Sequence, residues 1–142
     1  MNKIIIINGP NINLLGEREQ SQYGSISFDQ LKKKCLKKAQ ELGLNLEFVQ
    51  SNIEGELIGI IQDSRESDGI IINAAAYTHT SVGIGDAIKA IDTKVIEVHI
   101  SNTFSREEFR HNSYLSPVVD GIIIGFGLNS YELAIQSILS QR

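Results

Sequence analysis

Five short apolar runs recur along the chain, and the segments between them are long enough to form helices. We expect strands at residues 3–7, 46–49, 69–72, 95–100 and 121–124. The first, third and fifth runs are almost pure isoleucine, which is typical of strands buried on both faces of a parallel sheet. The second run alternates with polar residues, so we place it at an edge. Strands that alternate with helices predict an α/β fold with a doubly wound parallel sheet.

Helical periodicity fills the intervening segments. Ser27 and Gln30 form a capping-box pattern before an apolar stripe, and Gly43 is expected to end that helix. We interpret the lysines of this helix as a solvated face rather than an anion-binding site, and we interpret Cys35 as a core packing residue. Three further helices are expected around residues 57–64, 84–91 and 131–138. Five strands with an edge-like second strand indicate the flavodoxin-like order 2-1-3-4-5.

Length and composition fit a single domain over residues 1–142. The net charge of −4, without a basic tail, gives no reason to expect nucleic acid as a partner. The apolar run near the N-terminus is too short for a signal peptide or a membrane span. The single cysteine suits a reducing compartment, so we expect a cytoplasmic protein with no membrane partner.

Long strand-to-helix connections, over residues 8–27 and 101–117, contrast with short helix-to-strand connections. In a parallel sheet all the long connections emerge at the carboxyl edge, where ligands of such folds bind. The polar residues gather in the same loops. The candidates there are Asn11, Arg18, Tyr23, Asn73, His79, Ser101, Arg106 and Arg110.

The fourth predicted strand carries Glu97 and His99 among apolar residues, and at period two their side chains share one face. They could form a structural buried ion pair. Because burial of charge is costly and His99 ends the strand, we favour a functional role. Asn11, Tyr23 and His79 would each be ordinary in isolation, so it is their convergence on one edge that indicates a site.

The sequence lacks the patterns of several chemistries. No residues have zinc-ligand spacing, no GxSxG elbow is present, and neither GxGxxG nor GxxxxGK[ST] follows the first strand. We therefore expect no metal and no nucleotide cofactor. Tyrosine, histidine, asparagine and arginine remain, and they suit proton transfer next to a carbonyl group without a covalent step.

Four separated motifs together resemble the type II 3-dehydroquinate dehydratases along nearly the whole chain. They are NGPNINLLGERE with Tyr23-Gly24, QSN at 50–52, YTHTS at 77–81, and EVHISN at 97–102 with REEFR at 106–110. The resemblance implies a flavodoxin-like fold, no cofactor, and loss of water from 3-dehydroquinate to give 3-dehydroshikimate, a shikimate-pathway step in aromatic amino-acid biosynthesis. It also implies assembly as a homododecamer, built as a tetramer of trimers.

The resemblance further implies a role for each site residue. Tyr23 would be the base and Arg18 would lower its pKa. His99 would be the general acid, positioned by Asn73, and Asn11 would hold a water against the enolate oxygen. The backbone at Ile100 and Ser101 would bind the substrate carboxylate, whereas His79, Arg110 and Asp86 would bind ring hydroxyls, with Asp86 reaching a neighbouring subunit.

Two other readings stay open from the residues alone. A flavin- or nucleotide-binding module would have a short first loop rich in serine, threonine and glycine, whereas this loop is long. A non-enzymatic descendant would have lost Tyr23, Arg18 or His99, and all three are present. Gly83 and Gly85 near the start of the third helix are expected to lower its intrinsic stability.

Overall fold

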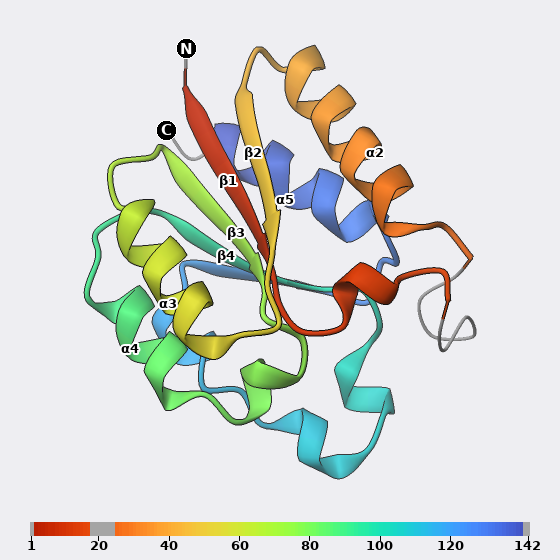
Figure 1. Cartoon of the computed structure of the whole chain (residues 1–142), viewed down its shortest axis with the longest axis vertical. Helices are drawn as coiled ribbons and strands as arrows, with labels where there is room; N and C mark the ends of the chain where they lie inside the picture. Colours follow the sequence, from red (N-terminus) through yellow and green to blue (C-terminus); the bar gives the residue numbers. More distant parts are fainter. Residues whose placement is uncertain (1, 18–24, 141–142) are drawn as a thin grey trace.

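A five-stranded, wholly parallel sheet forms the centre of the molecule (Figure 1). The computed structural model describes residues 2–17 and 25–140. The strands are β1 (Lys3–Asn8), β2 (Asn45–Gln50), β3 (Gly69–Asn73), β4 (Val95–His99) and β5 (Gly121–Ile124). Their order is β2-β1-β3-β4-β5, which confirms the predicted doubly wound, flavodoxin-like sheet. β4 ends at His99, one residue earlier than predicted.

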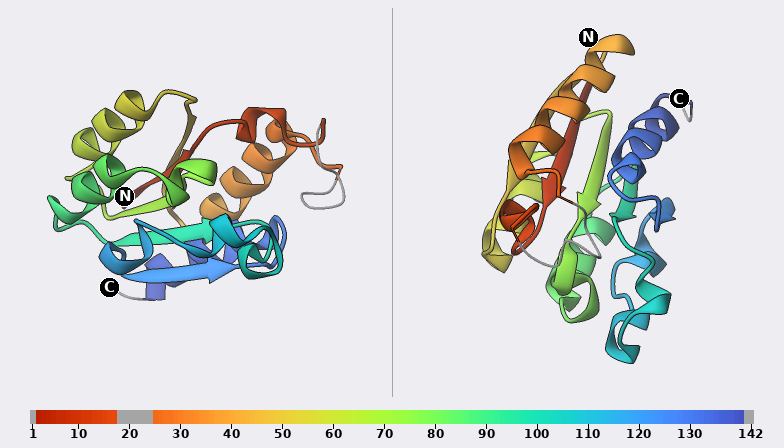
Figure 2. Two further views of the ribbon diagram at one scale, coloured as in Figure 1. Left: turned by 90° about the horizontal axis from the view of Figure 1, so that it is seen from below. Right: turned by 90° about the vertical axis from the view of Figure 1, so that its right-hand side faces the viewer.

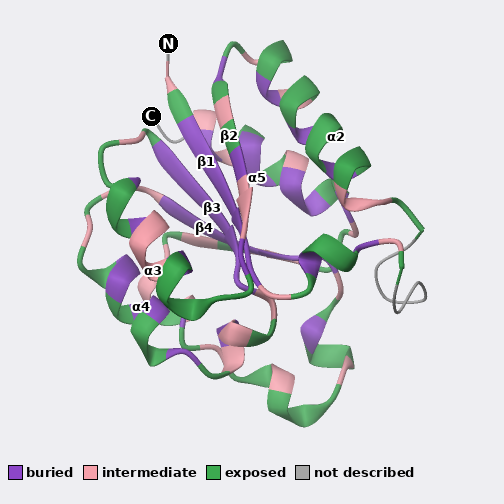
Figure 3. Ribbon diagram, in the orientation of Figure 1, coloured by how far each residue is buried: buried purple, intermediate pink, exposed green. Residues whose placement is uncertain are grey.

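Two pairs of helices cover the two faces of the sheet. α2 (Phe28–Glu41) and α5 (Asn129–Ser140) pack on one face, and α3 (Glu54–Asp63) and α4 (Val82–Lys89) on the other (Figure 1). The even-numbered isoleucines of β1 enter the first core and the odd-numbered ones enter the second. The central strands are consequently buried on both sides, while the helices expose their outer surfaces (Figure 3).

The expectations for the first helix are confirmed. Ser27 and Gln30 form the reciprocal capping box at the start of α2. Gly43 adopts a positive φ of 71° just beyond its end, which suits a glycine. Cys35 is fully buried, and this burial raises its pKa to about 12, so the thiol packs as an uncharged group.

Short 3-10 helices lie beyond the carboxyl ends of the strands (Figure 1; Figure 2, left). They are η1 (Ile12–Leu14), η2 (Ala75–His79), η3 (Thr103–Ser105) and η4 (Glu108–His111). A further one, η5 (Ser116–Val118), leads into β5. All five strands run toward this edge, so these segments lie beside the carboxyl ends of β1, β3 and β4 (Figure 2, right).

Two glycines allow backbones to approach closely beside that region. A Cβ on Gly9 would lie 2.4 Å from the carbonyl oxygen of Ala74, so the loops after β1 and β3 touch there. A Cβ on Gly85 would lie 2.7 Å from the carbonyl oxygen of Tyr114. The two early glycines of α4 do not prevent the helix, and Gly85 is the residue that lets this segment pack against it.

No helix in residues 2–17 and 25–140 is both long and apolar enough to cross a membrane.

Candidate active site

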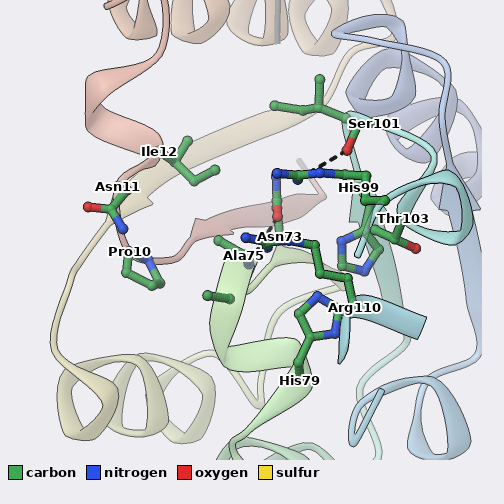
Figure 4. Close-up of a pocket in the computed structure, with 13 residues that line it drawn as sticks. Pro10, Asn11, Ile12, Asn73, Ala75, His79, His99, Ser101, Thr103 and Arg110 are labelled. Atoms are coloured by element: carbon green, nitrogen blue, oxygen red, sulfur yellow. Dashed lines mark hydrogen bonds between the residues drawn. The ribbon is translucent and has the colours of Figure 1, made fainter. Parts of the chain in front are cut away.

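A polar pocket opens at the carboxyl edge of the sheet, between the loop after β1 and the segments that follow β3 and β4 (Figure 4). Its walls combine asparagine and histidine side chains with two arginines. The lining residues are Pro10, Asn11, Ile12, Asn73, Ala75, Ala76, His79, His99, Ile100, Ser101, Thr103, Arg106 and Arg110. The long connections of the sequence therefore meet where they were expected to meet.

His99 and Glu97 form a buried pair on β4. The Nε2 atom of His99 lies 2.5 Å from Oε2 of Glu97, and the two residues are 6% and 1% exposed. Beside an ionised carboxylate, Nε2 carries a proton and donates it to Glu97. This arrangement leaves Nδ1 as the ring nitrogen of His99 for a ligand in the pocket.

Two serine hydroxyls complete the surroundings of the Glu97 carboxylate. Ser116 Oγ donates to Oε1 at 2.7 Å, and Ser113 Oγ lies 3.3 Å from Oε2. Burial by itself raises the pKa of Glu97, but the hydrogen bonds from His99, Ser116 and Ser113 outweigh it and lower the pKa below the usual 4.5. Glu97 is thus a charged group that holds His99 in place.

His79 faces His99 across the pocket, with 6.4 Å between the ring centroids (Figure 4). Its Nδ1 atom lies 2.7 Å from the backbone oxygen of Asn112, and therefore donates a proton to it. Burial lowers the pKa of His79, and the nearby His99 and Arg110 lower it further, against the opposing bond to Asn112. Neutral His79 then has Nε2 as a hydrogen-bond acceptor, which suits a ligand hydroxyl.

Two arginines supply positive charge to the pocket. Arg110 is held by Glu107, with 2.9 Å between Nε and Oε2. The side chain of Arg106 is 7% exposed, and its Nη1 atom lies 3.5 Å from Ser101 Oγ (dashed line in Figure 4). Guanidinium groups next to a hydroxyl and a strand end form a suitable surface for a carboxylate ligand.

Asn11 is fixed by residues from the end of β2. It has a left-handed backbone with φ of 69°, and its N–H donates to Asn52 Oδ1 at 3.0 Å. Gln50 Nε2 donates to the same Asn52 oxygen at 3.0 Å and to the backbone oxygen of Gly9 at 3.1 Å. The QSN motif therefore supports the loop that carries Asn11.

The structure brings most of the predicted site residues together. Seven of them line the pocket: Asn11, Asn73, His79, His99, Ile100, Ser101 and Arg110. Asp86 does not, because it is exposed on α4 and absent from the pocket wall of its own chain. Tyr23 and Arg18 lie outside the described residues.

Sequence reasoning did not find every contributor. The resemblance implied that Asn73 positions His99, and this stays a prediction; in the described residues the ring of His99 pairs with Glu97, and Asn73 bonds to Tyr131 and to the backbone of Ala75. The serines that hold Glu97 were missed, since Ser113 and Ser116 have no periodic relation to β4. Thr103 also lines the pocket without having been singled out.

In the part of the chain that the structure describes, no three histidine, cysteine or acidic side chains cluster as metal ligands would. The chemistry that the pocket can supply is proton transfer and charge stabilisation by histidine, arginine and amide groups. Fold and pocket together define the class: a flavodoxin-like α/β protein with a polar pocket, lined by two histidines and two arginines, at the carboxyl edge of its sheet.

Comparison with known proteins identifies the family within this class. Residues 2–139 match the family described as dehydroquinase class II, and the chain belongs to this family. A 3-dehydroquinate dehydratase of Prochlorococcus marinus (strain NATL1A) is 53% identical over 138 residues, which cover 96% of this chain and 95% of the relative.

Solved structures agree with the sequence relatives. The type II dehydroquinase of Butyrivibrio crossotus DSM 2876 is 44% identical, with a TM-score of 0.96 and 97% of both chains covered. The type II dehydroquinase of Propionibacterium acnes is 39% identical, with a TM-score of 0.95 over 99% of this chain and 97% of that one. The family membership favours an enzyme over a flavin-binding module.

Proposed function

We propose that this protein removes water from 3-dehydroquinate to give 3-dehydroshikimate, the dehydration step of the shikimate pathway, in the pocket at the carboxyl edge. The observation that carries the proposal is the buried Glu97–His99 pair. His99 of this pair lines the pocket, together with Arg106 and Arg110. The reaction is inferred from membership of the family, and the general acid is inferred from this pair.

His99 is the general acid in this proposal. Protonated His99 donates the Nδ1 proton to the leaving hydroxyl, the carbon–oxygen bond breaks, and water departs. The second ring proton stays on Nε2 against Glu97, whose negative charge stabilises the imidazolium before transfer. Glu97 does not touch the substrate and acts by holding His99.

Tyr23 is the proposed base, and Arg18 is its partner. The tyrosinate removes the proton from the carbon next to the ketone, which forms the enolate whose collapse expels the hydroxyl. Tyrosine has a reference pKa of about 10, so a tyrosinate at neutral pH requires a pKa lowered by roughly 3 units, or about 4 kcal/mol. A guanidinium in a closed site is the kind of group that lowers a pKa in this way.

The remaining pocket residues bind and orient the substrate. The carboxylate is bound at the backbone of Ile100 and Ser101, where the Arg106 guanidinium adds positive charge. His79 and Arg110 take the ring hydroxyls, and Asn11 holds a water against the enolate oxygen. No metal or organic cofactor takes part in this scheme.

Asp86 enters the scheme through assembly. We propose a cytoplasmic homododecamer, a tetramer of trimers, in which Asp86 of one chain completes the pocket of its neighbour. Two observations support self-association: Asp86 is exposed outside the pocket of its own chain, and several large apolar side chains are exposed on the surface. These are Phe104, Phe109, Tyr114, Ile122 and Phe126.

The test is to mix the purified protein with 3-dehydroquinate and follow the conjugated product by ultraviolet absorbance. Borohydride added with the substrate should leave activity intact, because none of the residues that line the described pocket is a lysine that could form an imine. Absence of product, or a substrate-dependent loss of activity with a reduced adduct in the mass spectrum, would contradict the proposal.

A further inference from the structure

A buried hydrogen-bonded chain ties α5 to the floor of the pocket. Tyr131 is 0% exposed, and its hydroxyl donates to Asn8 Oδ1 at 2.7 Å and accepts from Asn73 Nδ2 at 2.8 Å. Asn8 and Asn73 are paired in register at the carboxyl ends of β1 and β3, and both side chains point to the face that α5 covers. Neither Tyr131 nor Asn8 lines the pocket, whereas Asn73 does.

The directions of these hydrogen bonds are determined by the partners available. Asn8 donates its amide Nδ2 to the backbone oxygen of Val49 at 3.0 Å, so its Oδ1 must face Tyr131. Tyr131 has one hydroxyl proton, which goes to that oxygen, and toward Asn73 it can only accept. Burial raises the pKa of the Tyr131 hydroxyl above its usual value, so the proton stays in place.

Asn73 consequently has one permitted orientation. Its Nδ2 faces Tyr131, and its Oδ1 accepts the backbone N–H of Ala75 at 3.1 Å. A flipped amide would place two acceptors together at Tyr131 and two donors together at Ala75, which is costly in a buried position. The same bond holds Ala75, which lines the pocket in the left-handed region with φ of 53°.

We propose that Tyr131 is a positioning residue for catalysis: through its hydroxyl it fixes the amide of Asn73 and the backbone turn at Ala75, and so the shape of the pocket floor. Figure 4 shows Asn73 and Ala75 among the residues that line the pocket. The inference rests on the proposed function. In this orientation the side-chain amide of Asn73 presents a hydrogen-bond donor to the substrate, because its oxygen already accepts the backbone N–H of Ala75.

The experiment is a double-mutant cycle on kcat/KM with Tyr131→Phe, Asn73→Ala and the double variant. Removal of one partner from a buried hydrogen bond should lower kcat/KM by roughly 5- to 100-fold in Tyr131→Phe. In the Asn73→Ala background the same change should add less than about twofold, since residues that act through one another are not additive.

A matched control and a second variant keep the test decisive. Ser64, which follows the end of α3, has another buried hydroxyl, which donates to the backbone oxygen of Ile60. Ser64→Ala should lower stability while kcat/KM stays within about twofold. Asn8→Ala disturbs the side-chain amide of Asn73 indirectly. It removes the acceptor of the Tyr131 hydroxyl proton, which is then free to turn toward Asn73. It replaces Tyr131→Phe in the cycle if that variant fails to fold.

The outcomes separate the two proposals. A wild-type enzyme without turnover contradicts the proposed function and with it the role of Tyr131. With an active wild type, the positioning role is overturned if folded Tyr131→Phe and Asn8→Ala both keep kcat/KM within about twofold, or if their losses add fully to that of Asn73→Ala.

Discussion

At the scale of single residues, the carboxylate of Glu97 is the unusual feature, because a charge in the middle of a central strand is costly to bury. Three hydrogen-bond donors offset that cost: the ring of His99 and the hydroxyls of Ser113 and Ser116. The sequence placed Glu97 and His99 on one face of the strand by their spacing. It could not supply the serines, which are 16 and 19 residues away in the chain.

Replacement of Glu97 by glutamine tests this pair. A hydrogen bond to a charged group contributes about 1.5–3 kcal/mol, so loss of the charge behind His99 should lower kcat by roughly 10- to 150-fold. Because the pKa of Glu97 is lowered in the fold, its contribution to stability is present above the usual value of 4.5 and is lost as pH falls through the lowered value.

Urea unfolding of wild type and Glu97→Gln should therefore show a difference in stability at neutral pH that shrinks below pH 4.5. A difference that stays constant or grows on acidification would mean that Glu97 is not stabilised in its charged form.

At the scale of elements, the alternation of isoleucine runs and helical segments predicted the sheet order and the four helices. The 3-10 segments that shape the pocket were not predicted, since they depend on contacts between loops and carry no periodic pattern. Tyr131 shows the same limit: the sequence placed it in a predicted helix, but its partners Asn8 and Asn73 are 123 and 58 residues away. Helix periodicity predicts which face of a helix is buried, but it does not predict the hydrogen-bond partners of a buried hydroxyl.

The packing of α4 gives a prediction at this scale. Gly85→Ala should destabilise the protein by about 1–3 kcal/mol, because the added methyl would lie 2.7 Å from the Tyr114 carbonyl oxygen. Gly59→Ala in α3 is the matched control, since nothing lies within 4 Å of its added Cβ, and it should stabilise by up to about 1 kcal/mol. Denaturant unfolding measures both, and stabilisation by Gly85→Ala would show that α4 does not pack as closely as the structure has it.

At the scale of the whole molecule, one chain provides a pocket but keeps Asp86 away from it. A mixing experiment tests whether the neighbour supplies this residue. Tyr23→Phe and Asp86→Ala proteins, each impaired, are unfolded together and refolded. If Asp86 acts in the neighbouring site, some mixed sites contain both intact residues and activity should exceed that of either parent. No recovery in verified mixed oligomers, or a monomer by light scattering, would contradict the shared site.

The most direct measurement of the central claim is the turnover of 3-dehydroquinate by wild type, Tyr23→Phe and His99→Gln, followed by product absorbance. A general acid or base typically accelerates a reaction by about 10²–10⁴-fold, so each variant should lose at least about 10² in kcat while its circular dichroism stays that of the wild type. A folded variant of either kind that keeps more than about a tenth of the wild-type kcat would contradict the assignment of His99 as acid and Tyr23 as base.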